Sequence, residues 1–576
     1  MEPSDARLAR RALSAILLLT ALVTLPTLRY DFVFDDHPLI EHNAQLRSDA
    51  ELRPLLTRNH WSHHLPGKRG NYYRPVMMLN YRLTCEIAGP SPFAFHLVSV
   101  LQHLICVALV FQILLRLRLD LTATTAASLV FALHPSRAEV VAWVAGANSS
   151  FASAQTLAVV LLTLVALDNE SRGRRLALTA GAMLLTLTAV LSKESAATLP
   201  GQVGLAVFVA GGVARSVPAR LKTAAATATP VALVVAAGLG LRRLMLGYLS
   251  LSLTELETGA LLRNIPRAAL GHLELLALPV ARGPFYSLGP DPKLSLLWAL
   301  ATTALILGLV ALSLWPRESR RAVGFGWCWL GGTILPVLNL RALPRGEILH
   351  DRFLYLPGLG FAVVLGALLA LAMRRARLSP RNTVAALVGL ALSLAGLTLR
   401  ELPFWRDDRS LWRRAVEVAP DNPTAQLNQA VVLAGDGQTA RAERLLRGLD
   451  RDATPTSVRV SALDTLAVIA IRRRDFVTAE ATLDQLLRLE PLPRPLLLVK
   501  LATVQLARSR LEGARETLNR LLETAPSTPG AHYLVARYHL ADGRPDRAAE
   551  ACRRELERDP SHRGARRLLD AIRSRR

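Results

Sequence analysis

The 576-residue chain has few charged residues for its length and only four cysteines. Charged residues make up 20% of the sequence and hydrophobic residues 51%, a combination that is rare in soluble globular proteins. The cysteines, Cys85, Cys106, Cys328 and Cys552, are scattered along the chain. This scatter excludes a disulfide framework and a zinc-binding motif. The composition therefore indicates a membrane protein that is not held together by disulfides.

The chain also lacks a balance of charge, because its formal net charge is +24. The excess does not form a compact basic patch. Residues 403–576 carry 31 Lys+Arg against 23 Asp+Glu, and much of the remaining excess lies in short arginine clusters between apolar blocks. Positive charge in that position is typical of membrane proteins. We therefore expect no nucleic-acid partner.

Blocks rich in Leu, Ala and Val follow one another and stop near Leu402. A spanning helix needs about 20 apolar residues, and we expect the first block to be an uncleaved span. Segment 266–281 is short and interrupted by polar residues, so we expect it to be re-entrant or interfacial. The sequence predicts an all-α, polytopic helical bundle over residues 1–402. Its eleven expected spans are 11–28, 94–115, 120–134, 150–168, 176–192, 197–214, 225–241, 294–315, 322–340, 353–373 and 383–402.

The basic residues indicate the orientation of these spans. With eleven spans, six short segments on one side hold 18 basic residues, Arg215 among them. The three short connections opposite hold five, including Arg345 and Arg352. Because cytoplasmic loops are enriched in Lys and Arg, we expect a cytoplasmic N-terminus. The long loop 29–93 and the C-terminal region then lie on the extracytoplasmic side.

The C-terminal region, residues 403–576, has an internal repeat. A period near 34 residues with two helices per unit is the signature of tetratricopeptide repeats. We expect about four repeats that form a short solenoid with a concave groove. The groove either binds an acceptor or the repeats only brace the protein. Prolines recur at spacings of 34–36 residues, at Pro420, Pro455, Pro491, Pro526 and Pro560. Small residues mark the expected helix contacts at Ala467, Ala479, Ala502, Ala514, Ala536 and Ala548.

Two adjacent carboxylates, Asp35 and Asp36, follow the first expected span. Like charges this close disfavour joint ionisation, so one of them is a candidate general base. A divalent cation between them is a second hypothesis, although the chain offers no further obvious ligands. The alternative is an acidic turn at a helix end. Loop 29–93 contains "NYYRPVMMLNY" and is long enough to fold over a site.

Three further polar clusters lie at span ends on the same expected side: "HPSRAEVVAWVAGANSSFASA", "LSKESA" and "HDRFLYLPGLGF". In the first, Val140, Val141, Trp143 and Val144 predict a helix lying on the bilayer surface. Arginine is the preferred binder of phosphate because its planar fork makes paired, charge-assisted bonds. Lys193 could instead only mark the membrane interface. The candidate residues for binding a phosphate or a lipid head group are His134, Arg137, Glu139, Lys193, Glu194, Arg352 and Tyr355.

These segments, in this order, resemble the transmembrane and tetratricopeptide-repeat O-mannosyltransferases of the GT-C superfamily. The matching pieces are "DFVFDDHPLI", "LHPSRAEVVAWVAGANSSFASA", "LSKESA", "RFLYLPGLGF" and the repeats. Arg137 stands where the family usually has a second histidine. The resemblance implies a GT-C fold, a polyprenyl-phosphate-linked sugar donor and a catalytic role for Asp35 and Asp36. It also implies transfer of mannose to Ser/Thr hydroxyls. With so few eukaryotic features, we expect a homologue in the bacterial inner membrane with periplasmic repeats.

The expected mechanism uses the basic residues and the acidic pair. Arg352, helped by Lys193 or Arg137, holds the phosphate leaving group, and Asp35 or Asp36 removes the acceptor proton. Three alternatives remain. Sugar could pass to a lipid or a cell-envelope glycan. The chain could be a non-catalytic membrane scaffold that carries repeats. It could also be a transporter, although transporters need polar groups near the bilayer midplane.

Overall fold

The structure is a computed structural model that describes residues 3–63, 70–211, 216–280, 283–286, 288–344, 347–451, 454–490 and 493–574. Arg215, Arg345 and Pro491 lie outside these residues. The described residues form helices and no strand, which confirms the predicted all-α class. The chain divides into two compact units, residues 1–419 and 420–576. The division expected at residue 402 stays a prediction.

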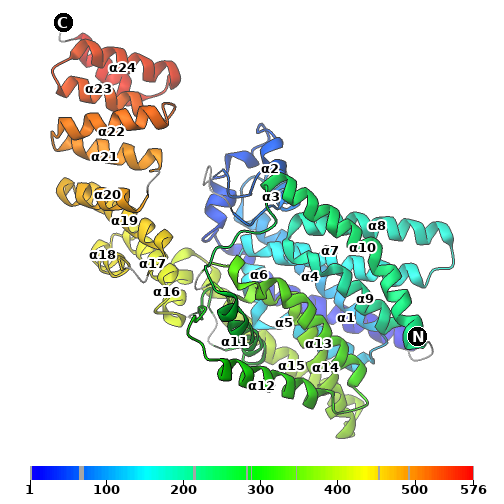
Figure 1. Cartoon of the computed structure of the whole chain (residues 1–576). Coiled ribbons are helices and arrows are strands. Elements are labelled where there is room, and N and C mark those ends of the chain that lie inside the picture. The colour runs from blue at the N-terminus through cyan, green and yellow to red at the C-terminus, as the bar shows by residue number, and fades with distance from the viewer. Residues whose placement is uncertain are drawn as a thin grey trace. The chain divides into compact units, whose positions relative to one another are not determined.

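The first unit is a bundle of long helices joined by short helical turns (Figure 1). Its helices are α1 (Pro3–Thr24), α2 (Arg53–Thr57), α3 (Pro75–Ala88), α4 (Pro92–Arg116), α5 (Leu121–Leu133), α6 (Ala138–Ala142), α7 (Asn148–Leu167), α8 (Arg172–Ser192), α9 (Leu199–Ala210), α10 (Val217–Leu246), α11 (Thr258–Ala277), α12 (Leu296–Leu314), α13 (Arg320–Ile334), α14 (Pro357–Arg375), α15 (Pro380–Glu401) and α16 (Asp408–Val418). The short turns are η1 (Leu25–Arg29), η2 (His37–Glu41), η3 (Ala44–Leu46), η4 (Pro135–Arg137), η5 (Ala145–Ala147), η6 (Glu194–Thr198), η7 (Leu335–Leu338), η8 (Leu340–Ala342), η9 (Asp351–Leu354) and η10 (Leu402–Trp405).

Small residues let the central helices approach closely. A Cβ added at Gly360 of α14 would overlap the carbonyl oxygen of Gly326 in α13 and lie 2.6 Å from the backbone nitrogen of Leu330. One added at Gly366 would lie 2.6 Å from the backbone nitrogen of Ala127 in α5. Lipid provides no hydrophobic force between helices, so membrane bundles rely on such tight backbone contacts. These glycines therefore hold α5, α13 and α14 together at the centre of the first unit.

Among the described residues, eight helical segments are long and apolar enough to cross a membrane, which fits an integral membrane protein. The predicted count of eleven is not confirmed. The expected spans at 120–134, 197–214 and 322–340 correspond to α5, α9 and α13, which contain 13, 12 and 15 residues. Segment 266–281 falls largely in α11, and its re-entrant placement stays a prediction. The eight segments are Ser4–Arg29, Pro92–Arg116, Ala145–Leu167, Arg172–Ser192, Val217–Leu246, Leu296–Leu314, Pro357–Arg375 and Pro380–Trp405.

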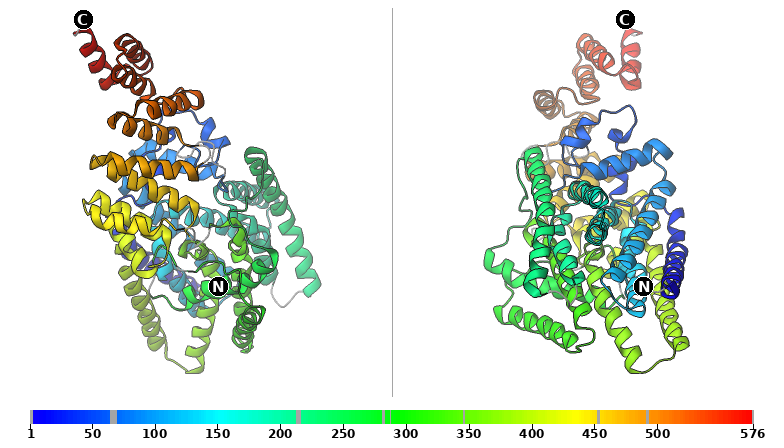
Figure 2. Two further views of the ribbon diagram at one scale, coloured as in Figure 1. Left: turned by 60° about the vertical axis from the view of Figure 1, so that its left-hand side comes forward. Right: turned by 90° about the vertical axis from the view of Figure 1, so that its right-hand side faces the viewer.

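The second unit is a series of antiparallel helix pairs that follow one another in chain order, seen in the yellow to red part of Figure 2. The turn inside each pair has the same geometry. In the first, the Gly437 and Gln438 N–H groups donate to the carbonyls of Ala434 and Leu433, which is a Schellman motif. The helices are α17 (Pro423–Gly435), α18 (Thr439–Gly448), α19 (Thr456–Arg472), α20 (Phe476–Leu489), α21 (Pro495–Ala507), α22 (Leu511–Thr524), α23 (Ala531–Ala541), α24 (Pro545–Arg558) and α25 (Arg563–Arg573).

The same motif recurs in the other three pairs, at Arg474, Ser509 and Gly543, and all four residues have positive φ. The left-handed conformation suits glycine and costs about 1–2 kcal/mol in other residues, so Arg474 and Ser509 are strained. The predicted contact points are confirmed, because all six alanines are fully buried: Ala467, Ala479, Ala502, Ala514, Ala536 and Ala548.

Candidate active site

A strained residue aims the acidic pair that follows the first span. Phe34 has a φ of 52°, a left-handed conformation that is uncommon outside glycine. Its N–H donates to Asp408 Oδ1 at 2.9 Å, and its ring packs 4.9 Å from the ring of Trp412 and 5.8 Å from that of Trp143. Such strain persists only where the surroundings determine it, and it concentrates at functional sites. The fold thus fixes the direction in which Asp35 leaves the backbone.

The two adjacent carboxyl groups have different environments. Asp36 is fully buried and accepts hydrogen bonds from the N–H groups of Val33 (3.2 Å) and Ala145 (2.7 Å). Burial raises the pKa of Asp36 to about 8, although both N–H groups act in the opposite direction. Asp36 therefore ties the first loop to the segment before α7.

Asp35 is only partly buried, and its carboxylate has no hydrogen-bond partner among the described residues. Burial raises the pKa of Asp35 to about 7. The charge of Arg352 works against this rise, and that of Glu347 adds to it. A general base is most effective when its pKa lies near the working pH. Both values lie near neutral pH, and of the two carboxyl groups Asp35 has the free oxygens that proton transfer requires.

Arg352 is held beside Asp35 by a buried carboxylate. Its Nη1 lies 2.6 Å from Glu139 Oε1, and its backbone N–H donates to Glu139 Oε2 at 2.8 Å. The side chain of Glu139 is 1% exposed and that of Arg352 18% exposed. The guanidinium also stands over the Trp143 ring, 5.1 Å from its centroid. Glu139 therefore orients Arg352, and part of the Arg352 side chain stays exposed.

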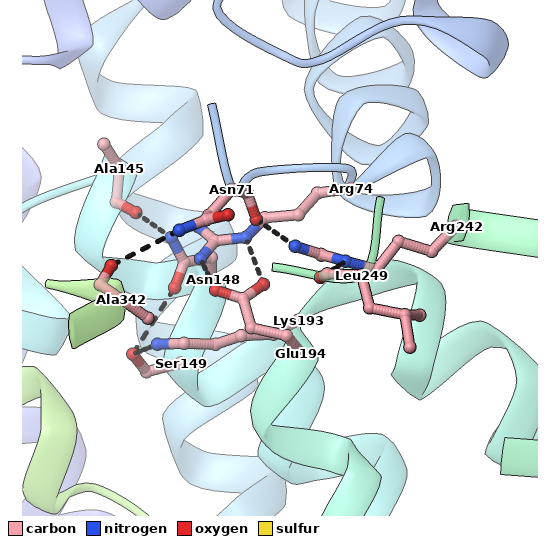
Figure 3. A network of polar contacts seen from close by, with 10 residues as sticks. All are labelled: Asn71, Arg74, Ala145, Asn148, Ser149, Lys193, Glu194, Arg242, Leu249 and Ala342. Carbon is pink, nitrogen blue, oxygen red and sulfur yellow. Dashed lines mark hydrogen bonds and ion pairs between the residues drawn. The ribbon is translucent and has the colours of Figure 1, made fainter. Parts of the chain in front are cut away.

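A second charged network lies next to this one, formed by the first loop and the end of α8 (Figure 3). Arg74 forms a two-bond ion pair with Glu194, with Nη2–Oε1 at 2.6 Å and Nε–Oε2 at 3.1 Å. Burial opposes ionisation of Glu194, but Arg74 overrides it and lowers the pKa to about 2. The Nζ of Lys193 donates to the hydroxyl of Ser149 at 2.5 Å. Burial and then Arg74 lower the pKa of Lys193 to about 7.

The charges of the two networks influence one another. Those of Arg74, Arg352 and Glu139 all act on the pKa of Lys193. Residues from loop 29–93, the segment before α7, η6 and the segment before α14 therefore form one site. The Lys193 side chain points to Ser149.

Three of the candidate binding residues lie inside the protein. Arg137 is 2% exposed, donates to the carbonyl of Tyr355 at 2.8 Å, and lies between the rings of Phe131 and Tyr355. A Cβ at Gly358 would overlap the Arg137 guanidinium, so a larger residue there would displace that group. The Tyr355 hydroxyl lies 2.7 Å from His103 Nδ1, and His134 Nε2 lies 3.0 Å from the carbonyl of Leu276. These contacts connect α4, the end of α5, α11 and the segment before α14 next to the charged site.

The predicted surface helix is wrong. Residues Ala138–Ala142 form α6, and the side chains of Val140, Val141, Trp143 and Val144 are only 0–4% exposed. The apolar residues cover all sides of this short helix because it is enclosed by the first unit. It does not lie on a bilayer.

Sequence reasoning missed several residues of the site: Arg74, Ser149, Glu347 and Asp408. Arg74 lies in "NYYRPVMMLNY", within the long first loop. Its partner Glu194 is 120 positions away. The position of Arg74 between two tyrosines and Pro75 was the one available signal.

The described residues do not favour a metal ion between Asp35 and Asp36. No group of three His, Cys, Asp or Glu residues in the described part of the chain could hold one. Both oxygens of Asp36 already face N–H donors, which repel a cation. Asp35 alone offers free oxygens, and one carboxylate is a poor site for a hard divalent cation.

Comparisons with known proteins place the chain among relatives. Protein O-mannosyl-transferase F38B6.6 of Caenorhabditis elegans is 25% identical over 75% of this chain and 61% of its own length. Protein O-mannosyl-transferase TMTC3 of Mus musculus is 26% identical over 68% of this chain and 45% of its own length. A tetratricopeptide repeat family model matches residues 499–563. The chain is a homologue of these protein O-mannosyl-transferases.

The chain thus spans roughly half the length of the curated protein O-mannosyl-transferases that it matches, 45–61% for the two above. The family model match confirms the predicted repeat type. Among solved structures, ArnT from Cupriavidus metallidurans bound to undecaprenyl phosphate aligns with 94% of this chain and 79% of its own, at 13% identity and a TM-score of 0.36.

Proposed function

We propose that the chain is a membrane glycosyltransferase that moves a sugar from a polyprenyl phosphate to an acceptor hydroxyl on the extracytoplasmic face. The homologous protein O-mannosyl-transferases make mannose the first sugar to test and protein Ser/Thr the first acceptor. The observation that carries the proposal is the free carboxylate of Asp35 beside Arg352. A base next to a cation is what transfer from a phosphate leaving group to a hydroxyl requires.

In the proposed mechanism, Asp35 is the general base. It accepts the proton of the acceptor hydroxyl as that oxygen attacks the anomeric carbon of the sugar. The bond from the anomeric carbon to the phosphate oxygen breaks, and the polyprenyl phosphate leaves with the bonding electrons. A single displacement of this kind inverts the anomeric configuration. Asp36 is a positioning residue, because its oxygens are occupied by the N–H groups of Val33 and Ala145.

Two cations serve the leaving group. Arg352 presents the open part of its guanidinium, and Lys193 provides an ammonium that makes no ion pair among the residues described. Both stabilise the charge that develops on phosphate as the sugar departs. We assign positioning roles to His134, Arg137, Glu139, Glu194 and Tyr355, which hold the backbone and the cations in place.

The test uses the full chain in lipid nanodiscs with polyprenyl-phosphate mannose labelled in the sugar, and a protein extract as acceptor. We expect label to enter protein and to be released by mild base, as for sugar on Ser or Thr. Label recovered in lipid or in a glycan would favour that acceptor class. If the folded protein transfers no sugar from any lipid-linked donor, the proposal is contradicted. The non-catalytic membrane scaffold is then the remaining alternative.

A further inference from the structure

A pocket with basic walls lies where the first helical segment of the chain ends. It has a volume of about 460 Å³. No acidic side chain of the described residues lines it, and none of its lining residues belongs to the acidic pair or to the two charged networks. The pocket is therefore separate from the candidate active site. Its lining residues are Leu22, Leu25, Pro26, Arg29, Tyr30 and Arg406.

Two of the candidate membrane segments end at this pocket. Ser4–Arg29 ends in its wall, and Pro380–Trp405 ends one residue before Arg406. The N–H of Asp31 donates to the carbonyl of Arg406 at 3.0 Å, which connects the two segment ends. The pocket is thus held between the ends of two apolar helices.

The helix that leads to the pocket has an apolar face that the protein leaves uncovered. Leu18, Leu22 and Leu25 are 63%, 57% and 54% exposed, and spacings of four and three residues place them on one face of the helix. In the right-hand view of Figure 2, α1 runs along the edge of the first unit. From Arg11 to Arg29 the chain rises about 27 Å at about 1.5 Å per residue, close to the about 30 Å of a hydrocarbon core. Lipid therefore covers this leucine face, and the pocket lies at the depth of the head groups.

The two arginines of the pocket have hydrogen-bond donors to spare. Arg29 is exposed and makes no hydrogen bond or ion pair among the described residues. Arg406 is 59% exposed at its side chain and contacts Asp407, with Nε–Oδ2 at 3.0 Å. The other carboxylate oxygen of Asp407 accepts the N–H of Ser410 at 2.7 Å and so caps α16. Because the planar fork of arginine makes paired, charge-assisted bonds with phosphate, this wall suits a phosphate group.

Tyr30 adds a neutral donor to the same wall. Its side chain is 7% exposed, and its hydroxyl makes no hydrogen bond among the described residues. Burial raises the pKa of Tyr30 to about 12, although the charge of Arg406 acts in the opposite direction. The hydroxyl therefore stays protonated. Tyrosine is enriched at membrane–water interfaces, where its ring is apolar and its hydroxyl is wet.

We propose that this pocket binds the head group of an anionic phospholipid, with an acyl chain along the leucine face of α1. The negative phosphate meets Arg29 and Arg406, and the hydrocarbon meets Leu22 and Leu25. Because Arg406 also binds the backbone of Asp31, a lipid bound here braces the start of the loop that carries Asp35. The site does not depend on the proposed sugar transfer.

The test measures the Kd of the full chain, delipidated in detergent micelles, for phosphatidylglycerol with a fluorescent acyl chain. Arg29→Gln removes a side chain without a partner, so the unfolding midpoint should stay unchanged. Its Kd should rise about tenfold, because one charged hydrogen-bonding group is lost. Arg243→Gln is the matched control, since Arg243 is an exposed arginine without a partner in the last turn of α10 and does not line the pocket. No binding by wild type, or one Kd for all three proteins, would overturn the proposal.

A second pair of variants tests the acyl chain. Leu25→Asn should raise the Kd, and Leu244→Asn, at a leucine of α10 that is 74% exposed and outside the pocket, should leave it unchanged. An unchanged Kd for both would show that no acyl chain lies on the leucine face and would overturn the proposal.

Competition then identifies the ligand. Unlabelled phosphatidylglycerol should displace the probe. Phosphatidylcholine with the same chains should not, because choline offsets the phosphate charge, and inorganic phosphate should not, because it has no chain. Displacement by phosphatidylcholine at the same concentration would show an unselective lipid contact, and displacement by inorganic phosphate a simple anion site. Stronger displacement by undecaprenyl phosphate than by phosphatidylglycerol would assign the pocket to a lipid-linked substrate. Each of these three results would overturn the proposal.

Discussion

Replacing each member of the acidic pair by alanine should separate catalysis from stability. Asp35→Ala removes a carboxylate that accepts no hydrogen bond among the described residues. Asp36→Ala removes one that accepts two, from Val33 and Ala145. The two substitutions are adjacent in sequence and chemically identical, so differences between them report only on their environments.

The size of each effect follows from these contacts. A buried donor left without an acceptor costs about 1–3 kcal/mol. Asp36→Ala leaves two such N–H groups, and removal of a buried carboxyl with a pKa near 8 offsets part of the loss. We expect Asp36→Ala to lower the free energy of unfolding by about 2–3 kcal/mol. Asp35→Ala should change it by less than about 0.5 kcal/mol and reduce the transfer rate by about 100-fold or more.

The assay follows thermal unfolding of the purified protein and sugar transfer in the same nanodisc preparation. Asp31→Ala is the matched control, since Asp31 is an exposed carboxylate of the same loop. The reasoning fails if Asp36→Ala unfolds at the same temperature as this control. It also fails if Asp35→Ala transfers sugar as fast as the control does.

Three further outcomes can be measured. Transfer should peak near pH 7, because Asp35 must be ionised and Lys193 protonated and the pKa of each is about 7; Glu347→Gln should move the rise on the acid side to lower pH, since Glu347 raises the pKa of Asp35. An unchanged pH profile in this variant would contradict the assigned base. Glu194→Gln leaves the buried Arg74 without its counter-charge and should lower the free energy of unfolding by about 3 kcal/mol, seen in the unfolding midpoint. Ser509→Gly should stabilise the repeats by about 0.5–1 kcal/mol in chemical denaturation, since glycine relieves a positive φ; a lower stability would contradict this.

The fold class and the repeats could be predicted because they depend on local patterns. Apolar block length predicts membrane helices, and the proline and alanine period predicts the helix pairs. The count of spans was less certain, because α9 and α13 end earlier than the apolar sequence does. The prediction of a surface helix was wrong because an apolar sequence has the same composition whether it packs against lipid or against protein.

The sequence predicted which clusters of polar residues belong to the candidate site. It did not predict which side chains in those clusters contact one another. Span-end position made Asp35, Lys193 and Arg352 candidates without structure, and their roles stay predictions. The distinction between Asp35 and Asp36 depends on the N–H of Ala145, which is 109 positions away. No local pattern carries that information, since it arises only from packing.

The central claim is that Asp35 is the base of a sugar transfer from a lipid phosphate. The most direct measurement is the release of labelled mannose from polyprenyl-phosphate mannose by wild type, Asp35→Asn and Asp31→Asn in nanodiscs at pH 7, where Asp35 is partly ionised and Lys193 partly protonated. The account predicts equal binding of the donor by all three proteins and release by wild type and Asp31→Asn alone. Release by Asp35→Asn at the wild-type rate would contradict it.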